Sequence, residues 1–309
     1  EMLFRCSAVG NLMSDSKAKL SEKQLIELDR LAGLRSAGKL TVKQTQTLAD
    51  FESRKNAPVE LSISAQSYVD EFIFEYKYRR VEEFSTNATD KGTKTEDDGI
   101  HVLNMAMKTR YKKNTERFNG DYLTGEPDII GKDMILDIKS NYTWKSFLKK
   151  KSIDSIYKWQ LAGYCQLLNK RKGAIAYTLN NTPLETIRSE ITKRYYKNGL
   201  VDLTDEDKAK IALNHIYTDK HIVDGNYVNG FWDYAKDYLG IFEDVQVPFI
   251  EVPIEKRLRY FEVEFTDEDF EKLDTQIEKA VKYIETNYPL IHNKPKILWK
   301  HYSKITTNK

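Results

Sequence analysis

The chain has 309 residues, of which 40% are hydrophobic and 31% are charged. This length allows a sizeable core, and the composition is typical of a globular protein with a heavily charged surface. No stretch approaches the roughly 18 consecutive apolar residues of a membrane span, and the interrupted apolar run at residues 2–13 does not predict a secretory signal. The net charge of +2 is not that of a passive, strongly basic DNA coat, but it is compatible with an enzyme whose cations are clustered.

The cysteine count bears on the cellular setting and on cofactors. Only Cys6 and Cys165 are present, and we expect both to be small buried side chains in a reducing, cytoplasmic environment. A typical iron–sulfur cluster needs four thiolates, so none is expected. No glycine-rich phosphate loop of the Walker type is present, and ATP hydrolysis is therefore not expected either.

In chain order, the first 80 residues predict three amphipathic helices. Apolar residues recur at helical spacing over residues 20–34, 41–55 and 62–80. A Ser21-x-x-Gln24 pattern marks the start of the first helix. We expect these helices to serve as a packing layer; a surface that guides DNA or binds a partner is the alternative.

The middle of the chain alternates between helical and extended patterns. A polar loop is predicted at residues 85–94, and a helix at residues 93–111. The next predicted elements are three extended segments, a helix and a strand, at residues 116–122, 123–131, 134–140, 155–169 and 173–179. The remaining ones are helices at residues 184–197, 205–217, 227–241 and 267–288 and a strand at residues 252–265. Without a repeat or clear linker, we expect one mixed α/β domain over residues 1–309, with a helical region at 1–85, a core at 90–180 and a completing part at 181–309.

Two acids and a lysine stand out in the stretch GEPDIIGKDMILDIKS. Alternation along a strand places Asp137 and Lys139 on one face, while Leu136 and Ile138 point to the other face. Asp128 opens the preceding apolar run, and the short connection predicts a hairpin that brings Asp128 beside Asp137. Converging carboxylates offer the oxygen ligands that Mg²⁺ prefers, and a nearby ammonium can orient a water and offset negative charge on a phosphate.

Glu96 is a third candidate acid. It lies in the first turn of a predicted helix, four residues before Ile100 on the apolar face. The alternative is a capping box formed with Thr93, in which Glu96 bonds the backbone.

These residues together resemble the PD-(D/E)xK nuclease superfamily, through Pro127-Asp128 and Asp137-Ile138-Lys139. Upstream lies Gly92-Thr93-Lys94-Thr95-Glu96, and downstream lies Gln160-x-x-x-Tyr164, a motif of the branch with RecB-type nucleases and lambda-type phage exonucleases. Within that branch the chain is most similar to phage exonucleases of the viral-recombinase (YqaJ-like) group. The resemblance implies a restriction-endonuclease-like core of order αβββαβ, a mixed central sheet flanked by helices, with extra helices at both ends.

The resemblance also assigns roles to residues. It implies Mg²⁺, with Mn²⁺ as a substitute, bound by Asp128, Asp137 and the backbone carbonyl of Ile138, with Glu96 near the metal and Lys139 as the catalytic lysine. Many RecB-type members carry a histidine on the helix, and Glu96 takes that place here. The supporting or DNA-contacting residues implied are Gln160, Tyr164, Arg5 and Ser7, the last two from the opening segment FRCSAVGNLM.

Two groups of basic residues can be interpreted in two ways. One follows the site strand, and the other falls on a later helix with Tyr195 and Tyr196 between its members. The cations are Lys145, Lys149, Lys150, Lys151, Arg188, Lys193, Arg194 and Lys197. They are either phosphate-tracking groups with stacking aromatics or ordinary solvated helix faces.

The function implied is a metal-dependent deoxyribonuclease that digests linear double-stranded DNA from the 5′ end in phage-type recombination. Ring-shaped trimers, a single-strand annealing partner and a bacterial host cytoplasm are carried over from the family as expectations. The alternatives are an endonuclease of the same superfamily, for restriction or branch resolution, and a non-catalytic DNA-binding relative. The intact Asp137-x-Lys139 pair argues against the last of these.

Overall fold

The computed structural model describes residues 2–15, 20–56, 60–80, 86–223, 226–242, 245 and 247–291. The chain divides into two compact units, which we call the terminal unit and the sheet unit. The terminal unit comprises Glu1–Val81, Asn119–Leu123 and Asp267–Lys309, and the sheet unit comprises Glu82–Phe118 and Thr124–Thr266. Residue 85, where the predicted loop begins, and residues 292–309, the end of the predicted domain, lie outside the described residues.

The terminal unit is mainly helical. Its elements are β1 (Phe4–Arg5), α1 (Cys6–Val9), the 3-10 turn η1 (Gly10–Leu12), α2 (Glu22–Ser36), α3 (Val42–Asn56), α4 (Ile63–Tyr78) and α12 (Asp267–Asn287). The four long helices confirm those predicted from apolar spacing. Helix α2 begins with the expected capping box between Ser21 and Gln24, and it packs on α3 through Leu28, Leu31 and Leu48.

Polar contacts join the last helix to the N-terminal part of the chain. The hydroxyl groups of Tyr283 and Tyr288 lie 3.3 and 2.6 Å from the carboxylate of Asp70 on α4. Lys279 and Gln276 each donate to Asp15 at 2.6 Å. The same helix buries an apolar face, so α12 is an integral part of the terminal unit.

The sheet unit is built on a four-stranded mixed sheet in the order β4-β5-β6-β9. The elements that form or flank this sheet are α5 (Asn87–Lys94), α6 (Glu96–Met107), β4 (Ile129–Ile130), β5 (Met134–Ser140), α7 (Trp144–Lys149), α8 (Ser155–Leu167), β6 (Lys172–Thr178), η2 (Ile254–Lys256) and β9 (Leu258–Glu264). Strands β5 and β6 run parallel, and each has an antiparallel neighbour on its outer side. The mixed α/β fold expected from the sequence is confirmed.

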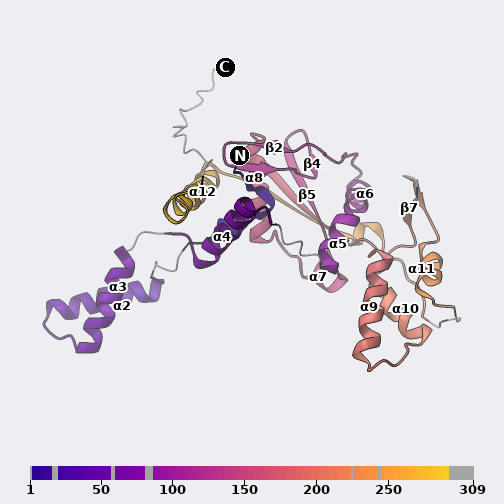
Figure 1. Cartoon of the computed structure of the whole chain (residues 1–309), viewed down its shortest axis with the longest axis horizontal. Helices are drawn as coiled ribbons and strands as arrows, with labels where there is room; N and C mark the ends of the chain where they lie inside the picture. Colours follow the sequence, from indigo (N-terminus) through magenta and orange to yellow (C-terminus); the bar gives the residue numbers. More distant parts are fainter. Residues whose placement is uncertain are drawn as a thin grey trace, which may run out of the picture. The chain divides into compact units, whose positions relative to one another are not determined.

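Alternation along β5 assigns its two faces to different helices. Leu136 and Ile138 pack in one apolar cluster with Ile100 and Leu103 of α6. Asp137 points to the opposite face, where its carboxylate meets Gln160 of α8. Figure 1 shows β5 with α6 and α8 near it. Asp137 and Lys139 of the site strand therefore face α8, and Leu136 and Ile138, which alternate with them, face α6.

The first predicted strand segment and the beginning of the second belong to another sheet. Strands β2 (Phe118–Asn119) and β3 (Leu123–Gly125) form a separate three-stranded sheet with β1, in the order β1-β3-β2. Pro127 separates β3 from β4, and proline has no N–H to donate to a ladder. The break at Pro127 therefore ends one strand and lets β4 join another sheet.

A second helical cluster follows β6, formed by α9 (Leu184–Lys197), α10 (Asp205–Leu213) and α11 (Phe231–Leu239), which lie together in Figure 1. Ile187, Ala209 and Ala235 lie in its core. Hairpin β7 (His221–Val223) and β8 (Asn226–Val228) precedes α11. Among the described residues no helix has the length and apolarity to cross a bilayer.

Two local predictions were wrong, and one short helix was not predicted. Residues 87–94 form α5 instead of a loop, because Thr86 and Thr89 make a capping box. The helix that was not predicted is α7, which follows a second capping box, between Thr143 and Ser146. Residues 226–228 form a strand, and the helix expected from residue 227 begins only at Phe231, after Gly230 at φ 95°.

Candidate active site

The hairpin predicted between the two apolar runs is present and fixes Asp128 beside the end of β5. Ile129 pairs with Leu136, and Gly131 donates to the carbonyl of Met134 at 2.9 Å. Asp128 accepts a 2.6 Å hydrogen bond at Oδ2 from the backbone N–H of Ile138. The Asp128 carboxylate therefore lies against the peptide that follows Asp137.

Asp137 is buried and surrounded by the other predicted site residues. Its Oδ1 accepts a 2.9 Å hydrogen bond from Gln160 Nε2, which also lies 3.0 Å from the Tyr164 hydroxyl. Its Oδ2 lies 2.7 Å from Lys139 Nζ, the distance of an ion pair, but outside hydrogen-bond geometry. Two residues predicted for the site, Lys139 and Gln160, thus contact the Asp137 carboxylate directly, and Tyr164 adjoins it through Gln160.

Burial and the neighbouring charges shift the pKa values of Asp128 and Lys139. Burial and the neighbouring charge of Asp137 raise the pKa of Asp128 to about 8, although the hydrogen bond from Ile138 opposes the shift. Burial lowers the pKa of the Lys139 ammonium, but attraction to Asp137 and Asp128 outweighs it, so that the pKa is raised overall. The Lys139 ammonium also lies over the Tyr157 ring at 4.7 Å and stays protonated near neutral pH.

Glu96 begins α6, as expected, but it is not part of a capping box. Thr93 lies inside α5, and Thr95 precedes α6 without a side-chain cap. The carboxylate of Glu96 lies 3.2 Å from Lys113 Nζ, and its charge contributes to the raised pKa of Asp128. Glu96 is therefore close enough for its charge to act on Asp128, and it has a cation of its own in Lys113.

The donor set fits a divalent cation held by few protein ligands. Two carboxylates, Asp128 and Asp137, crowd each other in a partly buried site, and Oδ2 of Asp137 receives no hydrogen bond from the described residues. Bound cations relieve such repulsion, and Mg²⁺ is commonly held by one or two carboxylates plus substrate phosphates and waters. Within the described part of the chain, no three His, Cys, Asp or Glu side chains are grouped closely enough to hold a metal by themselves.

Arg5 and Ser7 belong to the terminal unit. Arg5 forms a 3.1 Å ion pair with Glu75 of α4, and Ser7 lies exposed on α1. Among the basic residues, Lys150 pairs with Asp154, Lys193 pairs with Glu190, and Arg188 lies over the Tyr238 ring. These three cations have intramolecular partners, and their side chains are thereby oriented by the protein itself.

Two residues near the site were missed by the sequence analysis. Lys113, the partner of Glu96, lies in a loop whose path no local pattern determines. Asn180 is buried just beyond β6 and bonds both Thr95 and Ser140. A signal for Asn180 was present, because β5 and β6 are parallel and the residues that follow both strands must meet at one sheet edge.

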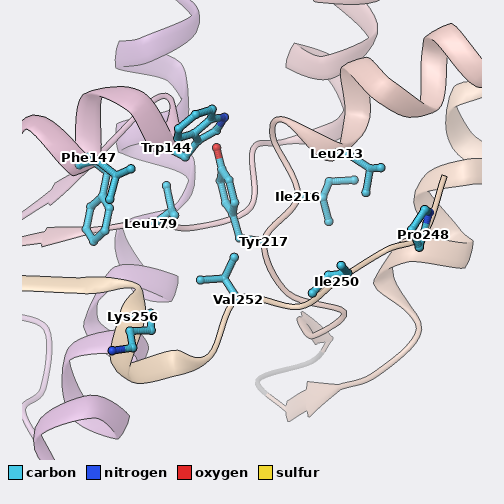
Figure 2. Close-up of a pocket in the computed structure, with 11 residues that line it drawn as sticks. Trp144, Phe147, Leu179, Leu213, Ile216, Tyr217, Pro248, Ile250, Val252 and Lys256 are labelled. Atoms are coloured by element: carbon cyan, nitrogen blue, oxygen red, sulfur yellow. The ribbon is translucent and has the colours of Figure 1, made fainter.

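A largely apolar cavity of about 440 Å³ lies elsewhere in the sheet unit. Its walls include Trp144 and Phe147 of α7, Tyr217, and Ile250 and Val252 across from them (Figure 2). Neither aspartate nor Lys139 is among its lining residues. The two aspartates and Lys139 thus lie at the hairpin and not in this cavity.

Comparison with known proteins finds similarity of fold but no matching family model and no significantly matching curated sequence. A solved structure of a phage-related exonuclease from Haemophilus somnus 129PT matches with a TM-score of 0.54 and 19% identity, over 92% of this chain and 94% of that chain. An alkaline exonuclease from Laribacter hongkongensis matches with a TM-score of 0.48 and 10% identity, over 92% and 88%. The TM-score of 0.54 shows that this chain and the phage-related exonuclease share a fold.

Proposed function

We propose that this protein is a metal-dependent deoxyribonuclease of the PD-(D/E)xK superfamily, and that it acts as an exonuclease on linear double-stranded DNA. The observation that carries the proposal is that Lys139 and Gln160 contact the Asp137 carboxylate, while Asp128 accepts a hydrogen bond from the N–H of Ile138 beside it. The fold shared with a phage-related exonuclease supports the same conclusion.

The residues present have distinct parts in phosphodiester hydrolysis. Asp128 and Asp137, with the carbonyl of Ile138, would hold Mg²⁺ or Mn²⁺. When bound, the ion supplies positive charge that polarises the phosphodiester and makes an attacking water more acidic. Lys139 brings a protonated ammonium beside the carboxylates, where it orients the water and offsets charge on the phosphate.

Gln160 and Tyr164 act on Asp137 rather than on the phosphate. The amide of Gln160 donates to Oδ1 of Asp137, which leaves Oδ2 directed toward Lys139 and available to a bound ion. The Tyr164 hydroxyl lies within hydrogen-bond distance of the same amide and limits its rotation. Partners of this kind orient ligating carboxylates and contribute substantially to metal affinity.

Digestion from the 5′ end, a role in phage-type recombination, a ring-shaped trimer and a single-strand annealing partner belong to the proposal through family resemblance. An end-dependent enzyme is distinguished from an endonuclease by its substrate. We expect wild-type protein with Mg²⁺ to release labelled nucleotides from linear duplex and to leave a closed circular duplex intact.

The matched variant is Asp128→Asn, which keeps the size of the side chain and removes its charge. We expect this variant to bind linear duplex but to digest it at least about 10²-fold more slowly. A loss of this order is typical when a group that stabilises transition-state charge is removed. Cleavage of the closed circle by the wild type would favour the endonuclease alternative. Equal digestion of linear duplex by the wild type and Asp128→Asn would refute the proposed site.

A further inference from the structure

We infer that Asn180 is a positioning residue that fixes the first turn of α6 to the end of β5 and so sets the position of Glu96 relative to Lys139 and Asp128. The inference rests on the proposed function. The hydrogen bonds of Asn180 go to Thr95, Ser140 and Thr178 and not to either aspartate. Asn180 acts through the residues that adjoin Glu96 and Lys139 in the chain.

The side-chain amide of Asn180 is the centre of a buried polar cluster. Its Nδ2 lies 3.1 Å from the backbone carbonyl of Thr95, 2.8 Å from Ser140 Oγ and 3.1 Å from Thr178 Oγ1. A carbonyl oxygen can only accept, so the amide NH₂ must face Thr95. Thr95 Oγ1 lies 2.9 Å from Ser140 Oγ and closes the cluster.

The elements that this cluster joins are those that carry the site. Thr95 immediately precedes Glu96, and its carbonyl also accepts the first helical hydrogen bond of α6, from Gly99 at 2.9 Å. Ser140 immediately follows Lys139 at the end of β5. Asn180 therefore fixes the two neighbours in the chain of Glu96 and Lys139 with a single amide.

Close packing reinforces the polar cluster. A Cβ added at Gly99 would lie 2.5 Å from Cγ2 of Ile138 and 3.4 Å from Asn180 Nδ2. Helix α6 thus approaches β5 at Ile138, between Asp137 and Lys139, more closely than any side chain at residue 99 permits. The amide holds the helix at this distance, and the glycine makes the distance attainable.

The unpaired half of the amide indicates that Asn180 has more than a stabilising role. Among the described residues, Asn180 Oδ1 has no hydrogen-bond partner, although the side chain is 1% exposed. An unsatisfied buried acceptor lowers stability. The Asn180 amide thus uses its N–H groups on Thr95, Ser140 and Thr178, at the ends of α6, β5 and β6, while its oxygen has no partner among the described residues.

The next residue provides a matched control. Asn181 is also buried, and its amide bonds Thr218 O at 2.8 Å and the backbone N–H groups of Tyr217 and Thr218 at 2.7 and 3.1 Å. Its partners lie in the segment after α10 and not on α6 or β5. Replacement of either asparagine by alanine removes a buried hydrogen-bonding amide from the same stretch of chain, but only Asn180→Ala releases α6.

The test compares Asn180→Ala with Asn181→Ala in the full chain. The readouts are the thermal midpoint without metal, the midpoint of a Mn²⁺ titration without DNA, and kcat and KM on linear duplex. We expect both variants to lose thermal stability. For Asn180→Ala alone, we expect Mn²⁺ binding to weaken by about 10-fold or more and kcat to fall by on the order of 10²-fold, with KM for DNA within about twofold of wild type.

A milder variant covers the case in which Asn180→Ala does not fold. Ser140→Ala removes one acceptor of the cluster from a half-buried position, and we expect it to weaken Mn²⁺ binding severalfold. Unchanged Mn²⁺ binding and kcat in folded Asn180→Ala, or in Ser140→Ala if Asn180→Ala does not fold, would overturn the inference. If wild-type protein neither binds Mn²⁺ nor digests DNA, the proposed function itself fails, and the inference fails with it.

Discussion

Replacement of Gly99 by alanine tests how closely α6 must approach the site strand. The added Cβ would lie 2.5 Å from the Cγ2 atom of Ile138, whereas carbon atoms in contact are separated by about 3.5–4.0 Å. Ile138 is β-branched and sits in a buried strand, so its methyl group cannot rotate away at low cost. Helix α6 must then move outward by about 1–1.5 Å, and Glu96 at its first turn moves with it.

The structure separates the effect on stability from the effect on activity. Overpacking of this kind costs about 1–3 kcal/mol, and alanine in a helix interior recovers about 1 kcal/mol relative to glycine. We expect a net loss of about 0–2 kcal/mol in the free energy of unfolding. A displacement of about 1 Å at a reacting centre can lower the rate by on the order of 10²-fold, which is the loss of kcat that we expect.

Gly33 on α2 supplies the control. A Cβ added at Gly33 meets no atom within 4 Å, and the residue lies inside a helix. We expect Gly33→Ala to gain about 1 kcal/mol of stability with unchanged digestion of linear duplex. Urea unfolding and single-turnover digestion measure both quantities for both variants. If Gly99→Ala digests duplex as fast as Gly33→Ala, α6 does not set the geometry of the site.

Three further outcomes follow from the structure. Burial lowers the pKa of Lys91 from 10.5 to about 7, so the unfolded chain binds the extra proton between these values and wild-type stability rises with pH across that window. Lys91→Met should therefore raise the free energy of unfolding most at pH 7 or below, by at most on the order of 5 kcal/mol, and progressively less toward pH 10. Denaturant unfolding of wild type and variant at pH 7 and 9.5 measures this difference. A difference that does not change with pH would contradict the lowered pKa of Lys91. Gln160→Leu should lower kcat by about 10–100-fold by removing the donor to Asp137, and Tyr164→Phe by less, as measured on linear duplex. Chelation with EDTA should abolish digestion and leave the far-UV circular dichroism unchanged, since apolar packing forms the core clusters. Persistence of digestion would exclude the metal.

The site strand could be read from the sequence because its pattern is local. Alternation separates Asp137 and Lys139 from Leu136 and Ile138, and the short connection to β4 leaves little choice but an antiparallel hairpin. Gln160 and Tyr164 were placed correctly on one helical face by their spacing of four residues. The parallel pairing of β5 with β6 brings that helix over the Asp137 face, as a right-handed crossover requires.

Contacts between distant segments were not readable in this way. The ion pair of Glu96 with Lys113 depends on the course of an irregular loop, and the hydrogen bonds of Asn180 depend on how closely α6 packs on β5. Helix α5 was taken for a loop because its polar residues show little apolar periodicity, while the buried Lys91 is its main inward anchor. In each case a tertiary contact decides what the local pattern leaves open.

The central claim is that Lys139, held against Asp137, acts in metal-dependent cleavage of DNA. The most direct measurement is the rate at which labelled nucleotides are released from linear duplex with saturating Mg²⁺, by wild-type protein and by Lys139→Ala at matched folded concentration. The account predicts a loss on the order of 10²–10³-fold in the variant. Equal rates for the two proteins would contradict it.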